Sequence, residues 1–155
     1  MVQIIFEVAK FIIEHHTEIE RLLSIALGGV SNIKRVINLT DQPVEVSKVD
    51  VKRFQPRTQT MKIAPKSTYD GEIGIPWADN DRQYSEHHMT IKVGGQTIAY
   101  IWQNGPLIRF STEDRWVEGA PGVSGQASAS GGERTLVIGA KDGTFGFLVT
   151  GHQQG

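Results

Sequence analysis

The chain of 155 residues contains no cysteine. This absence excludes disulfide bonds, thiolate metal sites and cysteine nucleophiles. Small secreted domains usually depend on disulfides, so the absence favours a soluble protein that is either cytosolic or released without a cleavable signal. The sequence leaves the choice between these compartments open.

Neither sign of charge is in excess, because 16 Lys and Arg residues stand against 17 Asp and Glu residues. Nucleic-acid-binding domains usually carry a basic surface that neutralises phosphates, so we expect no nucleic-acid partner. Charge is nevertheless uneven along the chain. Eight basic and three acidic residues give residues 30–66 a net charge of +5, and one basic and five acidic residues give residues 67–88 a net charge of −4. These charges either form a bipolar surface or, as we expect, cancel in space.

A catalytic signature is also missing. Residues 122–126, GVSGQ, fall short of a nucleophile elbow because the last position is Gln rather than Gly. The acidic pair Glu113-Asp114 has no acid–base partner that the sequence can identify. We therefore expect a binding protein and not an enzyme, with no cofactor.

Metal-binding patterns are equally incomplete. Residues 79–81, DND, resemble the opening of a calcium loop, but the Gly and the spaced Glu of an EF-hand do not follow. His87 and His88 are adjacent, and adjacent side chains on a strand point to opposite faces. We expect no metal site.

The first thirty residues carry a helical pattern. Between residues 3 and 27, apolar residues recur at helical spacing while charged residues take the other face. Gly28-Gly29 supplies a helix stop and a hinge. The charges exclude a membrane-spanning helix, which needs about 20 mainly apolar residues. The pattern predicts one long amphipathic helix with its glycine hinge over residues 1–29, and the apolar stripe includes Ile4, Val8, Ile12, Ile19 and Leu22.

From residue 30 onward the apolar period changes to two, which is typical of strands. Gly94-Gly95 separates two alternating segments, and residues 141–143, KDG, separate two more, so each predicts a β-hairpin. About eight short strands at this spacing indicate an all-β domain. We predict a mainly β fold, in which an antiparallel β-sandwich over residues 30–155 is preceded by the long N-terminal amphipathic α-helix.

One irregularity stands out in this strand pattern. Val44 and Val46 alternate on one parity, whereas Val49 and Val51 alternate on the other. A change of parity within one strand is typical of a β-bulge, so the sequence predicts a bulge near residues 47–48.

Residues 69–88 form the most site-like segment, because aromatic side chains lie among acidic, amide and histidine side chains. Such aromatics can stack on a sugar face or hold a choline head group by cation–π attraction. The alternative is that Pro76-Trp77 packs under a long loop as a satellite core. The ligand-binding interpretation predicts contacts from Tyr69, Trp77, Asp79 and Tyr84.

Residues 6–42, FEVAKFIIEHHTEIERLLSIALGGVSNIKRVINLTDQ, resemble the start of actinoporin-like pore-forming toxins. The shared order is an amphipathic helix, a glycine hinge with a basic pair (Gly28, Gly29, Lys34 and Arg35 here) and a strand that ends in a polar turn. The resemblance implies a cysteine-free β-sandwich that binds phosphocholine lipids through an aromatic cluster. It would add Trp116 to the candidate contacts and would make the apolar stripe of the helix the part that inserts after oligomerisation.

Three functions follow as hypotheses. The first is a membrane-active binding protein, in its fullest form a pore-forming cytolysin acting at target membranes, whose partners are lipid head groups. The second is a lectin-like β-sandwich that binds glycans or another ligand and whose helix is structural. The third is a homo-oligomer in which the helix pairs with copies of itself.

Overall fold

A computed structural model describes residues 31–52, 55–104, 107–125 and 132–151. The predicted helix over residues 3–27, with its five stripe residues, lies outside these ranges. Within them the elements are β1 (Ser31–Asn38), β2 (Val44–Lys52), β3 (Gln55–Ile63), β4 (Thr68–Gly74), α3 (Asp81–Glu86), β5 (His87–Val93), β6 (Gln96–Asn104), β7 (Leu107–Ser111), β8 (Gly132–Lys141) and β9 (Thr144–Gly151).

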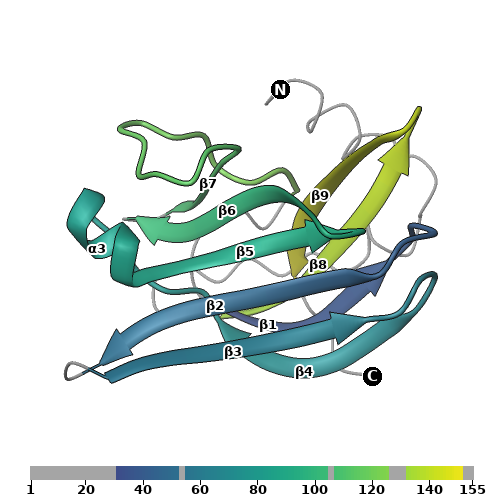
Figure 1. Cartoon of the computed structure of the whole chain (residues 1–155), viewed down its shortest axis with the longest axis horizontal. Coiled ribbons are helices and arrows are strands. Elements are labelled where there is room, and N and C mark those ends of the chain that lie inside the picture. The colour runs from purple at the N-terminus through teal and green to yellow at the C-terminus, as the bar shows by residue number, and fades with distance from the viewer. Residues whose placement is uncertain (1–30, 53–54, 105–106, 126–131, 152–155) are drawn as a thin grey trace.

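The strands form two sheets (Figure 1). The four-stranded sheet has the order β4-β1-β8-β9, and the five-stranded sheet has the order β3-β2-β5-β6-β7. This arrangement confirms a mainly β, sandwich-like fold. The pairing is not wholly antiparallel, however, because β1 and β8 run parallel. No hairpin joins these two strands, which lie far apart in the chain, so no tight turn imposes an antiparallel direction on them.

Both predicted hairpins are confirmed. Gly94 and Gly95 have φ values of 59° and 84° between β5 and β6, and Asp142 and Gly143 have φ values of 52° and 77° between β8 and β9. Two successive positive φ values define the type I′ turn, whose twist matches that of the flanking strands. Local chemistry at these turns therefore sets two of the strand pairs.

The predicted bulge near residues 47–48 is wrong. β2 keeps an unbroken register with both β3 and β5 along the described pairs. Val44, Val46, Lys48 and Asp50 therefore share one face of β2, and Val44 and Val46 are buried in the core. The inner face of this strand changes from apolar to charged as it approaches one end of the sandwich.

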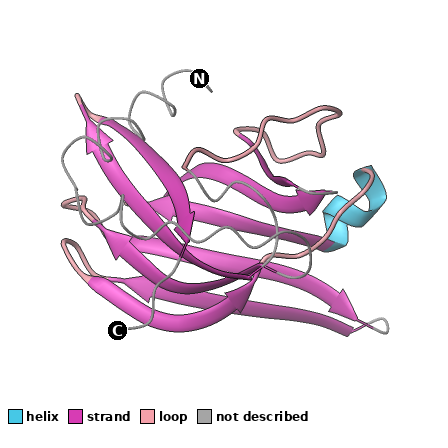
Figure 2. Cartoon of the chain, turned by 180° about the vertical axis from the view of Figure 1, so that it is seen from behind, coloured by secondary structure: helices cyan, strands magenta, loops and turns pink. Residues whose placement is uncertain are grey.

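The main core lies between the sheets, where side chains from both inner faces interdigitate. Phe110 and Phe147, for example, meet edge to face with their ring centroids 5.4 Å apart. A second, smaller cluster lies on the outer face of the five-stranded sheet and includes a residue of α3, the cyan helix in Figure 2. It consists of Ala78, Tyr84, Trp102 and Ala120, against which Tyr100, Trp116 and Val117 pack.

The uneven charge along the chain cancels partly in space, as the sequence favoured. Lys34 lies 3.3 Å from Glu72, and Arg35 lies 2.6 Å from Asp70. The basic pair Lys34-Arg35 thus lies within β1, where the register with β4 shifts, and faces the acidic side chains of β4. Among the described residues, none of the helices has the length and apolar character of a membrane span.

Candidate functional site

At one end of the sandwich, β2 ends and β5 begins next to α3 (Figure 1). A cavity of about 320 Å³ opens at this end. Its size falls within the range of about 300–1,000 Å³ that is common for small-molecule sites. Its lining combines charged, aromatic and apolar side chains: Lys48, Asp50, Gly74, Ile75, Pro76, Trp77 and His87.

The charged wall of the cavity comes from two neighbouring strands. Asp50 on β2 pairs directly with His87 on β5 in the antiparallel register. The Asp50 Oδ1 atom lies 2.7 Å from His87 Nδ1, and Asp50 Oδ2 lies 3.7 Å from Lys48 Nζ. The three side chains are 16%, 24% and 18% exposed in that order, so each is largely withdrawn from water and still reaches it.

The Asp50–His87 contact fixes how the imidazole is presented. A carboxylate can only accept a hydrogen bond, so the proton between the two groups lies on His87 Nδ1. In the neutral ring this leaves Nε2 as an acceptor. Asp50, His87 and Lys48 together offer a ligand carboxylate oxygens, one imidazole nitrogen and one ammonium group.

The aromatic wall is the indole of Trp77, which is 39% exposed. The backbone around it is firmly held: Ala78 N donates to Gln103 O at 3.0 Å, and Gln103 N donates to Pro76 O at 2.8 Å. Ser31 O accepts from Ile75 N at 2.8 Å. The segment from 75 to 78 is thus hydrogen-bonded to strands of both sheets. These hydrogen bonds hold the backbone that carries the Trp77 side chain in place.

The structure places the predicted ligand residues in three different settings. Trp77 lines the cavity, and Asp79 is exposed nearby in sequence, where it accepts from Asn104 Nδ2 at 2.9 Å. Tyr69 is 42% exposed on β4, but the length of that strand separates it from Trp77. Tyr84 and Trp116 belong to the second cluster on the outer face of the five-stranded sheet. The four predicted aromatics therefore do not form one exposed cluster.

Tyr84 is a packed residue. It is 3% exposed, its hydroxyl donates to Asp114 Oδ1 at 2.9 Å, and its ring stacks on His88 with centroids 4.5 Å apart. Burial raises the pKa of Tyr84 far above its usual range, and the hydrogen bond to Asp114 raises the pKa further. Tyr84 is therefore packed in the second cluster, whereas Trp77, the aromatic that the satellite-core alternative named, is exposed.

Sequence reasoning missed Lys48 and Asp50 as site residues, and it placed His87 in the site-like segment 69–88 without predicting a ligand contact from it. A signal was present, because Lys48 and Asp50 continue the parity of the core residues Val44 and Val46. The bulge hypothesis moved these charged side chains away from the core face. The same parity rule places His87 on the inner face of β5, in line with buried residues further along that strand.

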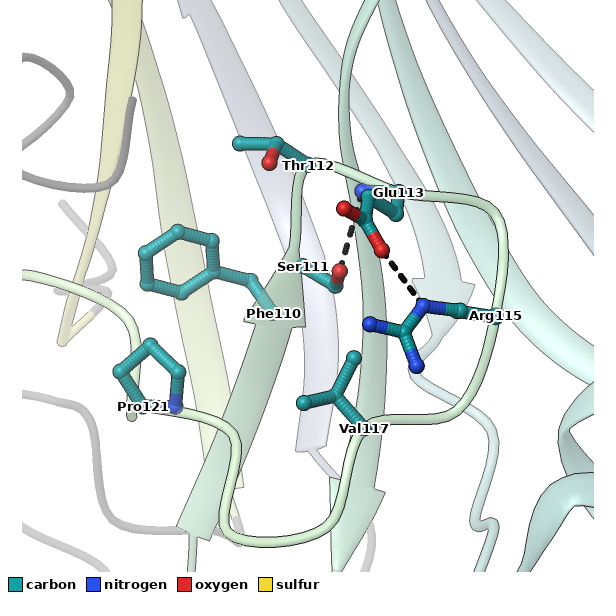
Figure 3. A pocket seen from close by; sticks show the side chains of 7 residues that line it. All are labelled: Phe110, Ser111, Thr112, Glu113, Arg115, Val117 and Pro121. Carbon is teal, nitrogen blue, oxygen red and sulfur yellow. Dashed lines mark hydrogen bonds and ion pairs between the residues drawn. The ribbon is translucent and has the colours of Figure 1, made fainter.

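A second hollow, of about 170 Å³, lies beside the loop after β7 (Figure 3). Glu113 and Arg115 form an ion pair on its rim, and each side chain is 62% exposed. Glu113 N also donates to Ser111 Oγ at 3.0 Å. Because this hollow is smaller and its charged groups point largely into water, we regard the cavity at Trp77 as the candidate site.

Metal coordination has no support in the part of the chain that the structure describes, where no three His, Asp or Glu side chains gather. His87 contacts Asp50, whereas His88 contacts the Tyr84 backbone carbonyl on the other face, as adjacency on a strand predicts.

Comparison of the chain with protein-family models, curated proteins and solved structures gave no match.

Proposed function

We propose that the protein is a lectin-like binding protein and that a saccharide occupies the cavity at Trp77. A sugar ring has an apolar C–H face, which stacks on an indole, and a rim of hydroxyl groups, which donate to carboxylates and accept from cations. The observation that carries the proposal is the exposed indole of Trp77 in one lining with the withdrawn Asp50 carboxylate.

The polar groups of the cavity support binding over catalysis. Asp50 is held by His87 on one oxygen and faces Lys48 on the other, so its position is set before a ligand arrives. Among the described residues of the lining, Asp50 is the single carboxylate, whereas glycoside hydrolysis uses a pair of carboxylates that flank the scissile bond. We therefore propose binding without chemical conversion of the ligand.

A glycan array probed with the full chain and with Asp50→Asn tests this proposal. Asn keeps the shape of Asp but removes the charge and one acceptor site, so we expect the full chain to retain a defined set of glycans and the variant to lose them. Absence of any retained glycan, or an unchanged pattern with Asp50→Asn, would refute saccharide binding at the cavity.

The second candidate is a membrane-active protein that binds phosphocholine head groups and inserts its N-terminal helix, in its fullest form by assembling several copies into a pore. The amphipathic pattern of residues 3–27 favours it. The cavity also suits a zwitterion, since an indole and a carboxylate attract the choline ammonium and Lys48 attracts phosphate. We rank it second because the predicted aromatics do not form one exposed docking cluster.

Dye leakage from phosphocholine and sphingomyelin vesicles tests the second candidate. We expect leakage with the full chain, a large loss with Ile12→Asp on the apolar stripe, and no loss with the matched control Glu14→Gln on the polar face. No leakage with the full chain, or equal leakage with both variants, would reject membrane insertion by this helix.

A further inference from the structure

Strands β8 and β9 are buried on both of their faces. On the inner face, Leu136 of β8 and Val149 of β9 pair in the main core. On the opposite face, Val137 pairs with Leu148, and both are 0% exposed. A strand that is buried on both sides is covered by a layer on each side.

The five-stranded sheet supplies only one of these two covers. It packs against the inner face, where the main core includes Leu136 and Val149 but neither Val137 nor Leu148. The second cluster does not include Val137 or Leu148 either, because it belongs to the outer face of the other sheet. The described elements are the strands of the two sheets and α3, which contacts β5 and β2 of the five-stranded sheet, so none of them forms a layer on the outer face of β8 and β9. We call this surface the outer face of the four-stranded sheet.

The shape of this outer face suits a helix. Gly139 of β8 and Gly146 of β9 pair directly with each other, and both occupy positions that belong to this outer face. The face therefore has no side chain at this pair. Thr135 and Thr150 form another opposed pair on the same face, 0% and 2% exposed. Glycines in strand interiors permit the close approach of another backbone, and the aliphatic pair at 137 and 148 supplies apolar contact beside them.

The chain itself contains one segment that fits this face. Residues 1–30 precede Ser31, the first residue of β1, which pairs with β8. The other stretches outside the described ranges span at most six residues, 126–131, and are too short to form a layer. A helix over residues 3–27 is about 37 Å long, comparable to the roughly 33 Å of the ten-residue strand β8.

We propose that residues 3–27 form a helix that lies on the outer face of the four-stranded sheet, with its apolar stripe against Val137 and Leu148. The acidic face of the helix points to solvent, and Gly28-Gly29 makes the turn into β1. This helix is a third layer of the domain. The proposal does not depend on the ligand of the cavity, which lies between the sheets at their end.

Thiol protection in this cysteine-free chain tests the proposal, because each introduced cysteine reports one position. We expect Val137→Cys to resist a thiol reagent in the full chain and to react at least about tenfold faster when Ile12→Glu and Ile19→Glu are added to the stripe. The matched polar-face changes Glu14→Gln and Glu18→Gln are expected to leave the protection unchanged. Leu136→Cys, on the inner face, reports whether the domain remains folded.

Protection of Val137→Cys that persists in the stripe variant while Leu136→Cys also stays protected would overturn the proposal. If the thiols at positions 137 and 136 both react, the stripe variant has unfolded and the thiol test gives no answer. Nuclear Overhauser contacts measured in the unaltered full chain then show what covers the outer face. Contacts from the Val137 and Leu148 methyl groups to residues 3–27 of the same molecule support the proposal. Contacts only to residues 126–131, or only to another copy in a mixed labelled sample, overturn it.

Discussion

At the scale of single residues, burial decides which of the charged side chains matter. Two ion pairs, Lys48–Asp50 and Lys66–Asp41, have the same N–O separation of 3.7 Å. The Asp50 side chain is 16% exposed, however, whereas that of Asp41 is 87% exposed. Water screens the second pair almost completely, and surface pairs of this kind contribute little to stability.

Asp50→Asn and Asp41→Asn therefore form a matched pair of variants. Asp50→Asn leaves Lys48 and His87 in the cavity without their counter-charge, so we expect it to lower the free energy of unfolding by about 1–3 kcal/mol. Asp41→Asn should change this free energy by no more than about 0.5 kcal/mol. Urea denaturation at neutral pH measures both, and equal effects would contradict the assignment of Asp50 to a withdrawn site.

Tyr84 makes a second prediction at this scale, which concerns alkaline pH. The raised pKa of Tyr84 means that the folded chain holds the phenolic proton more tightly than the unfolded chain does. The contribution of this proton to the free energy of unfolding is fully present below the ordinary tyrosine pKa of about 10. It is lost as the pH rises above that value, by up to about 1.4 kcal/mol per pH unit. Tyr84→Phe should therefore lose stability less steeply in this range.

Urea denaturation over a series of alkaline pH values compares the two proteins. At neutral pH we expect Tyr84→Phe to be the less stable by about 1 kcal/mol, because the hydrogen bond to Asp114 is gone. The gap should narrow above pH of about 10. If the free energy of unfolding depends on pH in the same way in both proteins, the proton on Tyr84 does not contribute to this pH dependence.

At the scale of elements, the edge of β9 is closed by backbone of the segment that follows β7. Val149 N donates to Ser124 O at 2.9 Å, and Gly125 follows with a φ of 114°. A Cβ added at Gly125 would lie 2.2 Å from Val149 O, which is backbone and cannot rotate away. An unprotected edge strand is an aggregation site, so this contact protects the four-stranded sheet.

Gly125→Ala should therefore destabilise the fold by about 3 kcal/mol and increase aggregation on heating. Gly119→Ala is the matched control, because Gly119 also has a positive φ of 68° but nothing within 4 Å of the added Cβ. The control should cost only the backbone strain, about 1 kcal/mol. Thermal unfolding followed by light scattering compares the stability and the aggregation of the two variants. Similar losses of stability in both would mean that movement of the loop relieves the clash at Gly125.

Elements set by local chemistry were predictable from the sequence, and elements set by distant partners were not. The hairpins at Gly94-Gly95 and Asp142-Gly143 follow from turn residues that tolerate the two positive φ values of a type I′ turn. The parallel pairing of β1 with β8 joins strands from opposite ends of the described chain, and no local pattern encodes it.

The candidate site shows the same division. The sequence left Trp77 open between an exposed ligand contact and a packed satellite core. The parity change at Lys48 and Asp50 likewise has two local explanations, a bulge or a polar end to the inner face. Only the register with β5, which places His87 opposite Asp50, decides between them. Likewise, Trp77 and Tyr84 are similar in sequence context, and their different exposure depends on the second cluster around Trp102.

At the scale of the whole molecule, the two sheets leave one end open for a ligand and one outer face for a further layer. The cavity lies where the charged end of β2 meets β5, and the proposed helix layer lies on β8 and β9. The cavity lies between the sheets at their end, whereas the proposed helix layer lies on the outer face of the four-stranded sheet, so a saccharide can bind without displacing the helix. Under this proposal, membrane insertion would require the helix to leave the outer face of β8 and β9, and Val137 and Leu148 would then be exposed to water.

Titration of the full chain with a glycan selected on the array, followed by tryptophan fluorescence, tests the central claim most directly. Trp77 is exposed whereas Trp102 is fully buried, so stacking of a sugar on Trp77 should change the emission. We expect Trp77→Ala to lose binding when measured by calorimetry, and Tyr69→Ala, which alters a similarly exposed aromatic elsewhere, to keep it. Binding that survives Trp77→Ala, or that Tyr69→Ala abolishes, would contradict a saccharide site at this cavity.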